Sequence, residues 1–491
     1  MDDMAAPNLT TSGPSPGYVP KKLIVACDGS WKNSDSGILG GTGLSWIWRG
    51  EEQVLTNVTR IARAIESVNQ KGQQQICYYQ PGVGSEGNLF GRVVGGALGL
   101  GLAANIREAY SFIANNYLHG DEIILIGFSR GAFTARSVGG LICDLGILNT
   151  DGLDHLVDVF EDWENCGAEG YTTLLGKDEP TFEMKTGLED TKAYIKKYRE
   201  ALVKIAYISP QEVPIKAIGV FDTVGSLGIP VNPLLQRLGL PHVLREYRFY
   251  NTDLDPNIEN AFQVLALDET RSAYRPALWQ KVPGVNSTLK QLWTCGGHTN
   301  AGGGYADSNL SDISLAWMMS NLAPFIQFTP GYVRKQHEKN QQRLQQANVP
   351  AKGLLWAAGQ LRNKGKGIQA LLGLVSRNPG RYHVLDKKTL KERQEEPLQN
   401  TNERIHVAVR SRKKTGGLNE KNEIVKYEPN GLAEEDYELV DENAEPGKAM
   451  WRYIGKDPQF AGLILLEDEL GIFEREIFED CVSKTAVEVG K

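Results

Sequence analysis

The chain lacks the features that mark several protein classes. Acidic residues (60 Asp and Glu) outnumber basic ones (53 Lys and Arg), and the net charge of −7 gives no reason to expect nucleic acid as a partner. The only candidate membrane span is the run Val93–Ala104, which is shorter than the ~20 residues needed to cross a bilayer. Its glycines favour close helix packing, with peripheral membrane contact as the alternative.

The N-terminal residues are not expected to form a secretory signal. Residues 1–20 contain no basic start followed by an apolar stretch, which excludes a secretory signal peptide. Their Pro, Ser and Gly content predicts a disordered lead. We therefore expect a cytoplasmic protein.

Cysteine is scarce and irregularly spaced. The six cysteines form no C-x-x-C pair, so neither a zinc site nor a disulfide framework is indicated. We expect no metal and a reducing compartment, where a thiol in an apolar strand behaves as a small hydrophobe.

What the chain does contain is a series of apolar runs separated by helical patterns. Most of the runs are rich in Val, Ile and Leu without alternation, which is typical of strands covered on both faces. Alternation of strands and helices predicts an α/β fold with a mainly parallel, doubly wound sheet. The expected strands lie in the runs 22–29, 74–85, 121–129, 215–226, 262–269 and 289–298, and the expected helices in 57–68, 105–117 and 131–145.

Two segments interrupt this alternation, at about 150–209 and 227–260. They are predicted to be cap insertions over the site, or alternatively surface insertions without a role there. Both segments fall within a catalytic domain that is predicted over residues 21–323. Residues 324–491 are predicted to be a C-terminal extension that packs on the core. The extension is more polar and contains no hydrophobic anchoring segment.

The strongest local signal is a serine between two glycines. Gly127-Phe128-Ser129-Arg130-Gly131 follows a buried strand and precedes a helix, which is the context of a G-x-S-x-G nucleophile turn. Small residues are needed there because the sharp turn brings the strand and helix together. The turn would lift the Ser129 hydroxyl above the sheet edge and aim the Arg130 N–H at a developing oxyanion. The Arg130 side chain is expected to pair with an acidic neighbour.

A serine nucleophile needs a base and an acid that orients it. His298 follows the last expected strand in a Gly-rich loop, so it is the expected base, whereas His406 alternates with apolar residues and is interpreted as structural. Asp222 and Asp268 both follow buried strands and remain alternative acids. Position alone favours Asp268, in which case Asp222 would accept hydrogen bonds from the amides of residues 223–225.

The loop after the first strand is expected to supply a second oxyanion donor. Its candidates are the N–H groups of Gly29 and Ser30. Asp28 offers a different interpretation, as a metal ligand of a phosphatase. That interpretation ranks low because no second carboxylate is close in sequence. Glu269 and Arg271 are expected to pair with each other.

Taken together, the ordered motifs resemble a known family. The chain resembles the α/β-hydrolase family named for the catalytic domain of type VI secretion phospholipase effectors, which includes fungal members. The resemblance covers about Lys21 to Met319 and rests on the motifs KLIVACDGSWKN, TNVTRIARAI, YYQPGVGS, IGFSRGAFTARSVGGLI, GVFDTVGS, ALDETR and GGHTNAGGGYAD. The resemblance implies an α/β-hydrolase fold, esterase chemistry and a lipid substrate. Ser129 and His298 match the family's nucleophile and base motifs. The family often has Asp where this chain has Asn300.

These observations predict a serine hydrolase that cleaves carboxylic esters through an acyl-enzyme, without a cofactor. The substrate would be a small-molecule or lipid ester. The alternative is a non-catalytic binding scaffold that keeps the hydrolase fold. The completeness of the serine and histidine motifs argues against that alternative.

Overall fold

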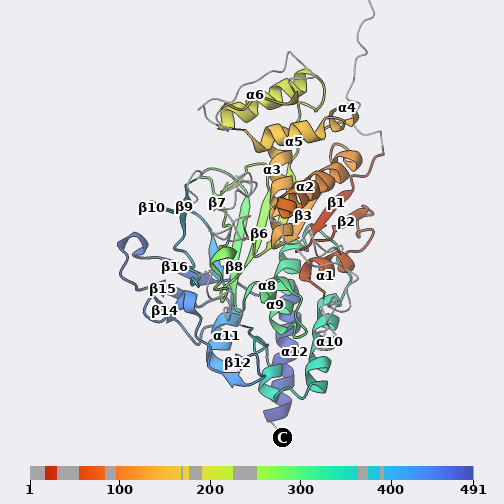
Figure 1. Cartoon of the computed structure of the whole chain (residues 1–491). Coiled ribbons are helices and arrows are strands. Elements are labelled where there is room, and N and C mark those ends of the chain that lie inside the picture. The colour runs from red at the N-terminus through yellow and green to blue at the C-terminus, as the bar shows by residue number, and fades with distance from the viewer. Residues whose placement is uncertain are drawn as a thin grey trace, which may run out of the picture.

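The centre of the structure is a ten-stranded sheet, seen in the computed structural model of Figure 1. The structure describes residues 17–29, 55–82, 96–166, 170–175, 191–224, 252–362, 374–386 and 392–489. The strand order is β14-β15-β16-β11-β8-β6-β4-β3-β1-β2, and all neighbours from β16 to β2 are parallel. The bounds are β1 Lys22–Cys27, β2 Gln75–Gln80, β3 Glu122–Phe128, β4 Ile215–Phe221, β6 Asn260–Ala266, β8 Thr288–Thr294, β11 Glu403–Ile405, β14 Tyr437–Val440, β15 Met450–Tyr453 and β16 Ile464–Glu467. The predicted α/β fold with a mainly parallel sheet is confirmed.

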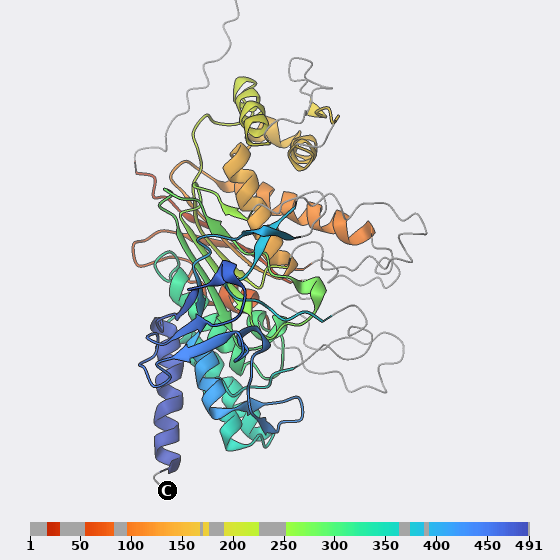
Figure 2. The same ribbon diagram turned by 90° about the vertical axis from the view of Figure 1, so that its left-hand side faces the viewer.

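Helices cover both faces of the sheet, which explains why its central strands do not alternate. Leu23 and Val25 of β1 pack in one core cluster with α2 (Gly96–Asn116) and α3 (Arg130–Leu145). Ile24 and Ala26 pack in the other cluster with α1 (Asn57–Ala64) and α9 (Asn309–Leu322). Figure 2 shows α2 and α3 on one side of the sheet and the C-terminal helix α12 (Ile472–Val489) on the other.

The strand order reverses beside β1, which pairs with both β2 and β3. Cys27 of β1 pairs with Gly127 of β3, and Phe128 of β3 pairs with Phe221 of β4. The residues that follow these strands therefore reach the same carboxyl edge. Such a switch point is where open α/β sheets bind ligands.

The described part of the segment 150–209 extends the layer formed by α2 and α3. It contains α4 (Thr150–Leu153), α5 (Leu156–Glu164) and α6 (Thr191–Lys204), which contribute Phe160, Trp163 and Tyr198 to the cluster around α2 and α3. In Figure 1 these helices lie at the top, whereas α8 (His298–Gly302), which begins with the expected base, lies near the centre. The described residues of the segment expected as a first cap thus pack beside α2 and α3. Of the second expected cap, residues 227–251 lie outside the described residues.

Residues 324–491 add strands to the main sheet and also contribute side chains to its core. They supply β11 and β16, and β15 and β14 follow as antiparallel neighbours. Ile405, Trp451 and Ile477 belong to the same core cluster as Trp293 of β8. The smaller elements are β5 Asp253–Leu254, β7 Gln280–Lys281, β9 His383–Leu385, β10 Glu392–Pro397, β12 Gly417–Leu418, β13 Ile424–Val425, α10 Tyr332–Gln346, α11 Val407–Thr415 and short 3-10 turns at Ser272–Tyr274, Ala351–Leu354, Asn430–Leu432 and Pro458–Phe460.

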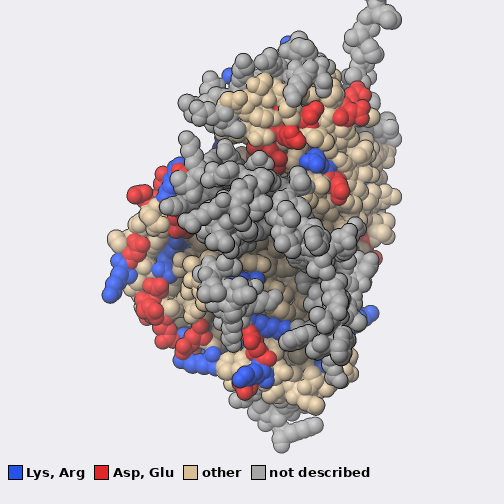
Figure 3. All heavy atoms as spheres, viewed as in Figure 1, with Lys and Arg blue, Asp and Glu red and all other residues tan. Residues whose placement is uncertain are grey.

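The surface over the C-terminal strands carries both signs of charge. Figure 3 shows Lys and Arg interspersed with Asp and Glu on that side of the molecule. One such pair joins Glu438 of β14 to Arg452 of β15. Across the described helices, none combines the length and apolar character that a membrane span requires.

The shared sheet predicts that residues 21–323 do not fold on their own. Truncation after Ala323 would expose the edge of β8 and the apolar surface that Ile405 and Trp451 cover. We expect the truncated chain to be aggregated or to lack a cooperative unfolding transition, as measured by size-exclusion chromatography and thermal denaturation beside the full chain. A monodisperse truncated protein with cooperative unfolding would contradict this.

Candidate active site

Ser129 occupies the turn between β3 and α3 in a conformation that side chains rarely adopt. Its φ of 58° and ψ of −120° place it at the N-cap of α3, and its N–H donates to the Phe221 carbonyl oxygen at 3.1 Å. A Cβ on Gly127 would lie 2.4 Å from the Gly131 carbonyl oxygen, and one on Gly131 would lie 2.2 Å from that of Cys27. Because both obstacles are backbone atoms, the glycines are required for the turn to close.

Ser129, His298 and Asp222 form one buried hydrogen-bonded chain. The Ser129 Oγ lies 2.8 Å from His298 Nε2, and His298 Nδ1 lies 2.6 Å from Asp222 Oδ2. The three residues are 9%, 6% and 0% exposed. Such an arrangement can withdraw the hydroxyl proton through the imidazole while the carboxylate fixes the ring.

Further contacts hold the imidazole in place. The ring lies against Phe128 and meets the edge of Tyr274, with centroid distances of 4.7 and 4.9 Å. The backbone N–H of His298 donates to Glu269 Oε2 at 3.2 Å. Glu269 in turn accepts two hydrogen bonds from the Arg271 guanidinium. The structure thus contains the Glu269–Arg271 pair expected from the sequence, placed at the start of α8.

Asp222 is held at the end of β4 by contacts to two other parts of the chain. Its N–H donates to the Val264 carbonyl oxygen at 2.7 Å, and its Oδ1 accepts from the Ala266 N–H at 3.0 Å. Its Oδ2 also accepts from Arg377 Nη2 at 3.2 Å. Burial alone would raise the pKa of Asp222, but Arg377, His298 and the Ala266 amide outweigh it and lower the pKa to about 2. Asp222 is therefore an anion at neutral pH.

Asp268 does not reach the imidazole, so the preference for it over Asp222 is wrong. Its Oδ2 accepts from the Gly296 N–H at 2.6 Å and from the Tyr427 hydroxyl at 2.8 Å, and burial raises its pKa. The physical reason is strand order: β4 is adjacent to β3, whereas β6 lies one strand farther from Ser129. Asp268 instead fixes the backbone just before His298. If Asp268 were the acid, Asp222 was expected to accept hydrogen bonds from the backbone amides of residues 223–225. The amides of residues 223 and 224 do not bind it, and residue 225 lies outside the described part.

The two expected oxyanion donors differ in their surroundings. Arg130 is the first residue of α3, where backbone N–H groups have no partner within the helix. Gly29 lies against Ser129, but its N–H donates to Asp28 Oδ1 at 2.6 Å and is already engaged. Ser30 is outside the described residues. The Arg130 guanidinium has no carboxylate partner among the residues that the structure describes, contrary to expectation, and burial lowers its pKa.

Asp28 is saturated by hydrogen bonds from the protein. Its Oδ2 accepts from the hydroxyls of Thr56, Thr59 and Tyr79 at 2.6 to 2.8 Å, and burial raises its pKa. No cluster of His, Cys, Asp and Glu suited to a metal ion occurs in the described ranges. Asp28 therefore ties β1 to α1 and β2.

Two other sequence observations find structural explanations. His406 caps α11 through a bond from the Ala408 N–H and contacts Glu474 at 2.8 Å, in agreement with its structural interpretation. Asn300, which replaces the family's Asp, accepts from the Gly297 N–H and donates to the Gln360 carbonyl oxygen. An amide can make both bonds, so the loop geometry at His298 is kept.

Sequence reasoning missed Arg377 and Tyr274. Arg377 lies 155 residues after Asp222 in the extension, and no motif surrounds it. Its Nη2 also donates to the Tyr274 carbonyl oxygen at 2.7 Å, so one guanidinium supports both the carboxylate and a residue against the imidazole. Only the folded chain brings these residues together.

Comparison with known proteins identifies the family. Residues 21–321 match the model described as "T6SS, Phospholipase effector Tle1-like, catalytic domain". This match covers more than half of the chain, and the chain belongs to this family. The resemblance seen in the sequence is thereby confirmed, and the membership indicates a hydrolase.

Individual relatives are more distant. The chain is 28% identical over 251 residues to the uncharacterized protein YEL023C of Saccharomyces cerevisiae, covering 47% of this chain and 31% of the relative. Among solved structures, it is similar to a Tle1 effector bound to the VgrG spike of the type 6 secretion system (18% identity, TM-score 0.28, 58% of this chain and 51% of that chain). It is also similar to an uncharacterized protein from Pseudomonas aeruginosa (13% identity, TM-score 0.32, 69% and 52%). The chain thus spans about a third of the yeast relative's length and about half of each solved chain.

The Arg377–Asp222 contact predicts a pH-dependent loss of stability in Arg377→Met. The pKa of folded Asp222 lies below the unfolded value of about 3.9, so its ionised form stabilises the fold above about pH 4, and this contribution is lost as the pH falls toward 2. We expect Arg377→Met to reduce the free energy of unfolding by about 2 to 3 kcal/mol at pH 7. The difference from the unmodified chain should shrink between pH 4 and pH 2, as measured by urea denaturation.

The control is Arg393→Met, which removes an exposed cation paired with Glu396 and Asp386. It should unfold like the unmodified chain at each pH. A deficit in Arg377→Met that stays constant from pH 7 to pH 2 would show that Asp222 is not the group stabilised.

Proposed function

We propose that this chain is a serine hydrolase that cleaves carboxylic esters, with Ser129 as nucleophile, His298 as base and Asp222 as orienting acid. The observation that carries the proposal is the buried hydrogen-bonded chain from Asp222 through His298 to Ser129. Membership of a phospholipase-effector-like family supports a lipid ester as the substrate class. A reducing compartment such as the cytoplasm is part of the proposal, because Cys27, Cys77 and Cys295 are present as thiols without a disulfide in the described structure.

Acyl transfer proceeds in two steps. In the first, Ser129 Oγ attacks the ester carbonyl carbon while His298 Nε2 takes the hydroxyl proton. The tetrahedral intermediate collapses when the imidazolium returns that proton to the leaving alkoxide, which gives an acyl-enzyme and a free alcohol. In the second step, water attacks the acyl-enzyme with His298 again as base, which releases the acid and restores Ser129.

The backbone at the start of α3 is suited to stabilise the oxyanion. The Arg130 N–H is free of the helix's own hydrogen bonds, and the positive end of the α3 dipole lies at the same point. The strained torsions of Ser129 hold its Oγ toward His298, so little reorganisation is needed as charge develops.

Asp222 stabilises the imidazolium that forms during the reaction, and Arg377 is proposed as its positioning residue. The carboxylate receives His298 at Oδ2, and Ala266 at Oδ1 fixes its plane. Arg377 is 3% exposed and bonds the same Oδ2, so it restrains the carboxylate and keeps it ionised. It touches no reacting atom.

The nucleophile is tested by Ser129→Ala. We expect this variant to lose ester hydrolysis by at least about 10³-fold in kcat, because the attacking atom is absent. It should also lose labelling by a fluorophosphonate probe. The assay uses p-nitrophenyl butyrate and a medium-chain phospholipid, with circular dichroism as the test of folding.

Ser314→Ala is the matched control. Ser314 is a buried serine on α9, where its hydroxyl donates to the Leu310 carbonyl oxygen of the same helix. It should keep activity and labelling. Full activity in folded Ser129→Ala would exclude the proposed nucleophile, and the absence of labelling in the folded unmodified chain would favour the scaffold alternative.

The roles of Asp222 and Asp268 are distinguished by substituting each of them with Asn. Asp222→Asn should lower kcat by roughly 10³- to 10⁴-fold, because an amide cannot stabilise the imidazolium and favours the wrong tautomer. Asp268→Asn should lower thermal stability through the loss of its bonds to Gly296 and Tyr427, with kcat reduced far less. Steady-state kinetics and melting temperatures of both variants provide the test, and an equal loss of kcat would reject the assignment.

A further inference from the structure

A cavity of about 320 Å³ lies along the helix that follows Ser129, outside the hydrogen-bonded chain of the proposed active site. Phe133, Arg136, Ser137 and Gly140 contribute one face of α3 to its wall, and the segment from Ser272 to Trp279 contributes another part. Its volume falls in the range of small-molecule pockets. Arg136 is two turns, or about 10 Å, beyond Ser129 along the helix.

The unusual feature of this cavity is the Arg136 guanidinium. It stacks over the Trp279 ring with its central carbon 3.9 Å from the ring centroid, and its Nη1 donates to the Ala277 carbonyl oxygen. No other described residue accepts a hydrogen bond from it, and no described carboxylate is within ion-pair distance. A guanidinium has five N–H donors, so most of its donors have no partner among the described residues.

Arg136 is partly buried and lines the cavity. Burial lowers the pKa of Arg136 to about 9, and no carboxylate opposes this effect. A cation removed from water normally has an ion-pair partner in the protein. The missing partner is the first indication of an anionic ligand.

The platform under Arg136 is rigid. The backbone N–H and carbonyl oxygen of Trp279 are both bonded to the Gln291 side chain at 2.8 Å. The Ala277 carbonyl oxygen also accepts from the Gln263 side chain, and the Ala277 N–H donates to Thr223. The guanidinium is therefore fixed before any ligand arrives, which lowers the entropy lost on binding.

A second observation concerns another residue of the cavity wall. His383 of β9 also lines the cavity and is 6% exposed, yet neither of its ring nitrogens has a hydrogen-bond partner in the described part of the chain. Glu392 is 3.8 Å from its Nδ1, too far for a hydrogen bond. A buried imidazole without partners requires a group to bind it.

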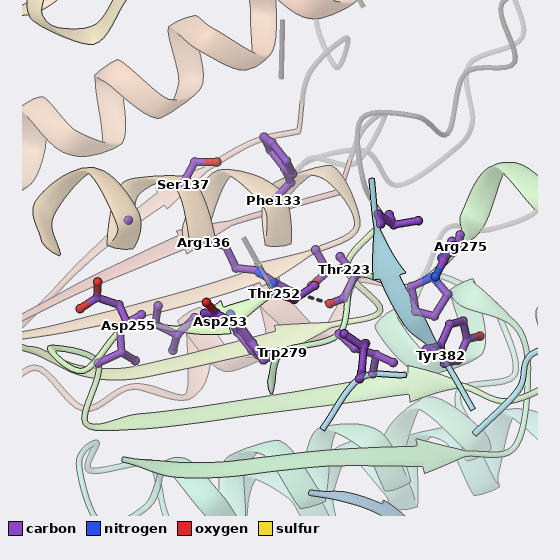
Figure 4. Close-up of a pocket in the computed structure, with 18 of the residues that line it drawn as sticks. Phe133, Arg136, Ser137, Thr223, Thr252, Asp253, Asp255, Arg275, Trp279 and Tyr382 are labelled. Atoms are coloured by element: carbon purple, nitrogen blue, oxygen red, sulfur yellow. Dashed lines mark hydrogen bonds between the residues drawn. The ribbon is translucent and has the colours of Figure 1, made fainter. Parts of the chain in front are cut away.

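Three acidic residues also line the cavity. Figure 4 shows Asp255 on one side of Arg136, and Arg275 and Tyr382 on the other. Asp144, Asp253 and Asp255 already accept bonds from Trp163, Gln280 and the Asn257 amide, respectively. On the other side Arg275 is already paired with Glu392 at 2.6 Å, so Arg136 is the cation available to an anion, and Phe133, Leu385 and Leu398 add apolar surface to the cavity.

We propose that this cavity binds the carboxylate or phosphate group of a small amphiphilic ligand, with the anion paired to Arg136 and the apolar part against the neighbouring aromatic and aliphatic side chains. The proposal does not depend on hydrolysis at Ser129. Charge-assisted bonds from a planar guanidinium suit both anions.

The test measures binding in the full-length Ser129→Ala chain, which cannot turn over a ligand. Isothermal titration with octyl phosphate, octanoate, octanol and inorganic phosphate separates the charge from the apolar part. Octyl phosphate or octanoate should bind at least tenfold more tightly than octanol. Equal affinity for octanol would overturn the proposal, and equal affinity for inorganic phosphate would overturn its amphiphilic part.

Variants identify the residue. In the Ser129→Ala chain, the further substitution Arg136→Gln should lower the affinity for the preferred anion at least tenfold and leave the affinity for octanol unchanged. Asp255→Asn, in the same cavity, should bind the anion equally or more tightly. Undiminished anion binding by Arg136→Gln, or an equal loss in Asp255→Asn, would reject the site. Thermal denaturation shows which variants are folded, and Arg136→Lys, expected to bind with intermediate affinity, replaces Arg136→Gln if that variant is not.

Discussion

The carboxylate of Asp222 is the point on which the candidate site depends. It accepts a bond from the Ala266 amide, faces the His298 ring at 2.6 Å and receives Arg377 from a segment 155 residues away. A buried carboxylate is unfavourable unless it is surrounded by donors, and here three different segments provide them. The same contacts that stabilise this buried anion also fix the His298 ring that faces Ser129.

The described contacts also show why the C-terminal part is inseparable from the site. The family model ends at residue 321, yet β11 and β16 continue the sheet beyond β8, and Arg377 lies in the same later part of the chain. In the described structure, the site therefore includes a cation that the family-matched residues do not supply. The extension contributes to the electrostatics at Asp222 as well as to the core.

The sequence was informative where a constraint is local. β1, β3 and β4 are continuous apolar runs, and Gly127 and Gly131 surround a turn whose sterics allow few alternatives, so the sheet and Ser129 could be predicted. The choice between Asp222 and Asp268 depends on strand order, which both residues' motifs leave open. β11 and β16 have three and four residues, too few to give a periodic signal. Arg377 acts across the fold and leaves no local pattern.

Two arginines near the site differ in whether the protein itself supplies a partner for their charge. Arg377 is buried and its charge is balanced by Asp222. Arg136 is partly buried and lines a cavity, where its described contacts are an aromatic ring and one carbonyl oxygen. A structural role alone would be met by an apolar side chain against Trp279, without the unfavourable desolvation of a cation. The retained charge is explained when a ligand completes the pair. The unpartnered imidazole of His383 across the same cavity requires a binding group for the same physical reason.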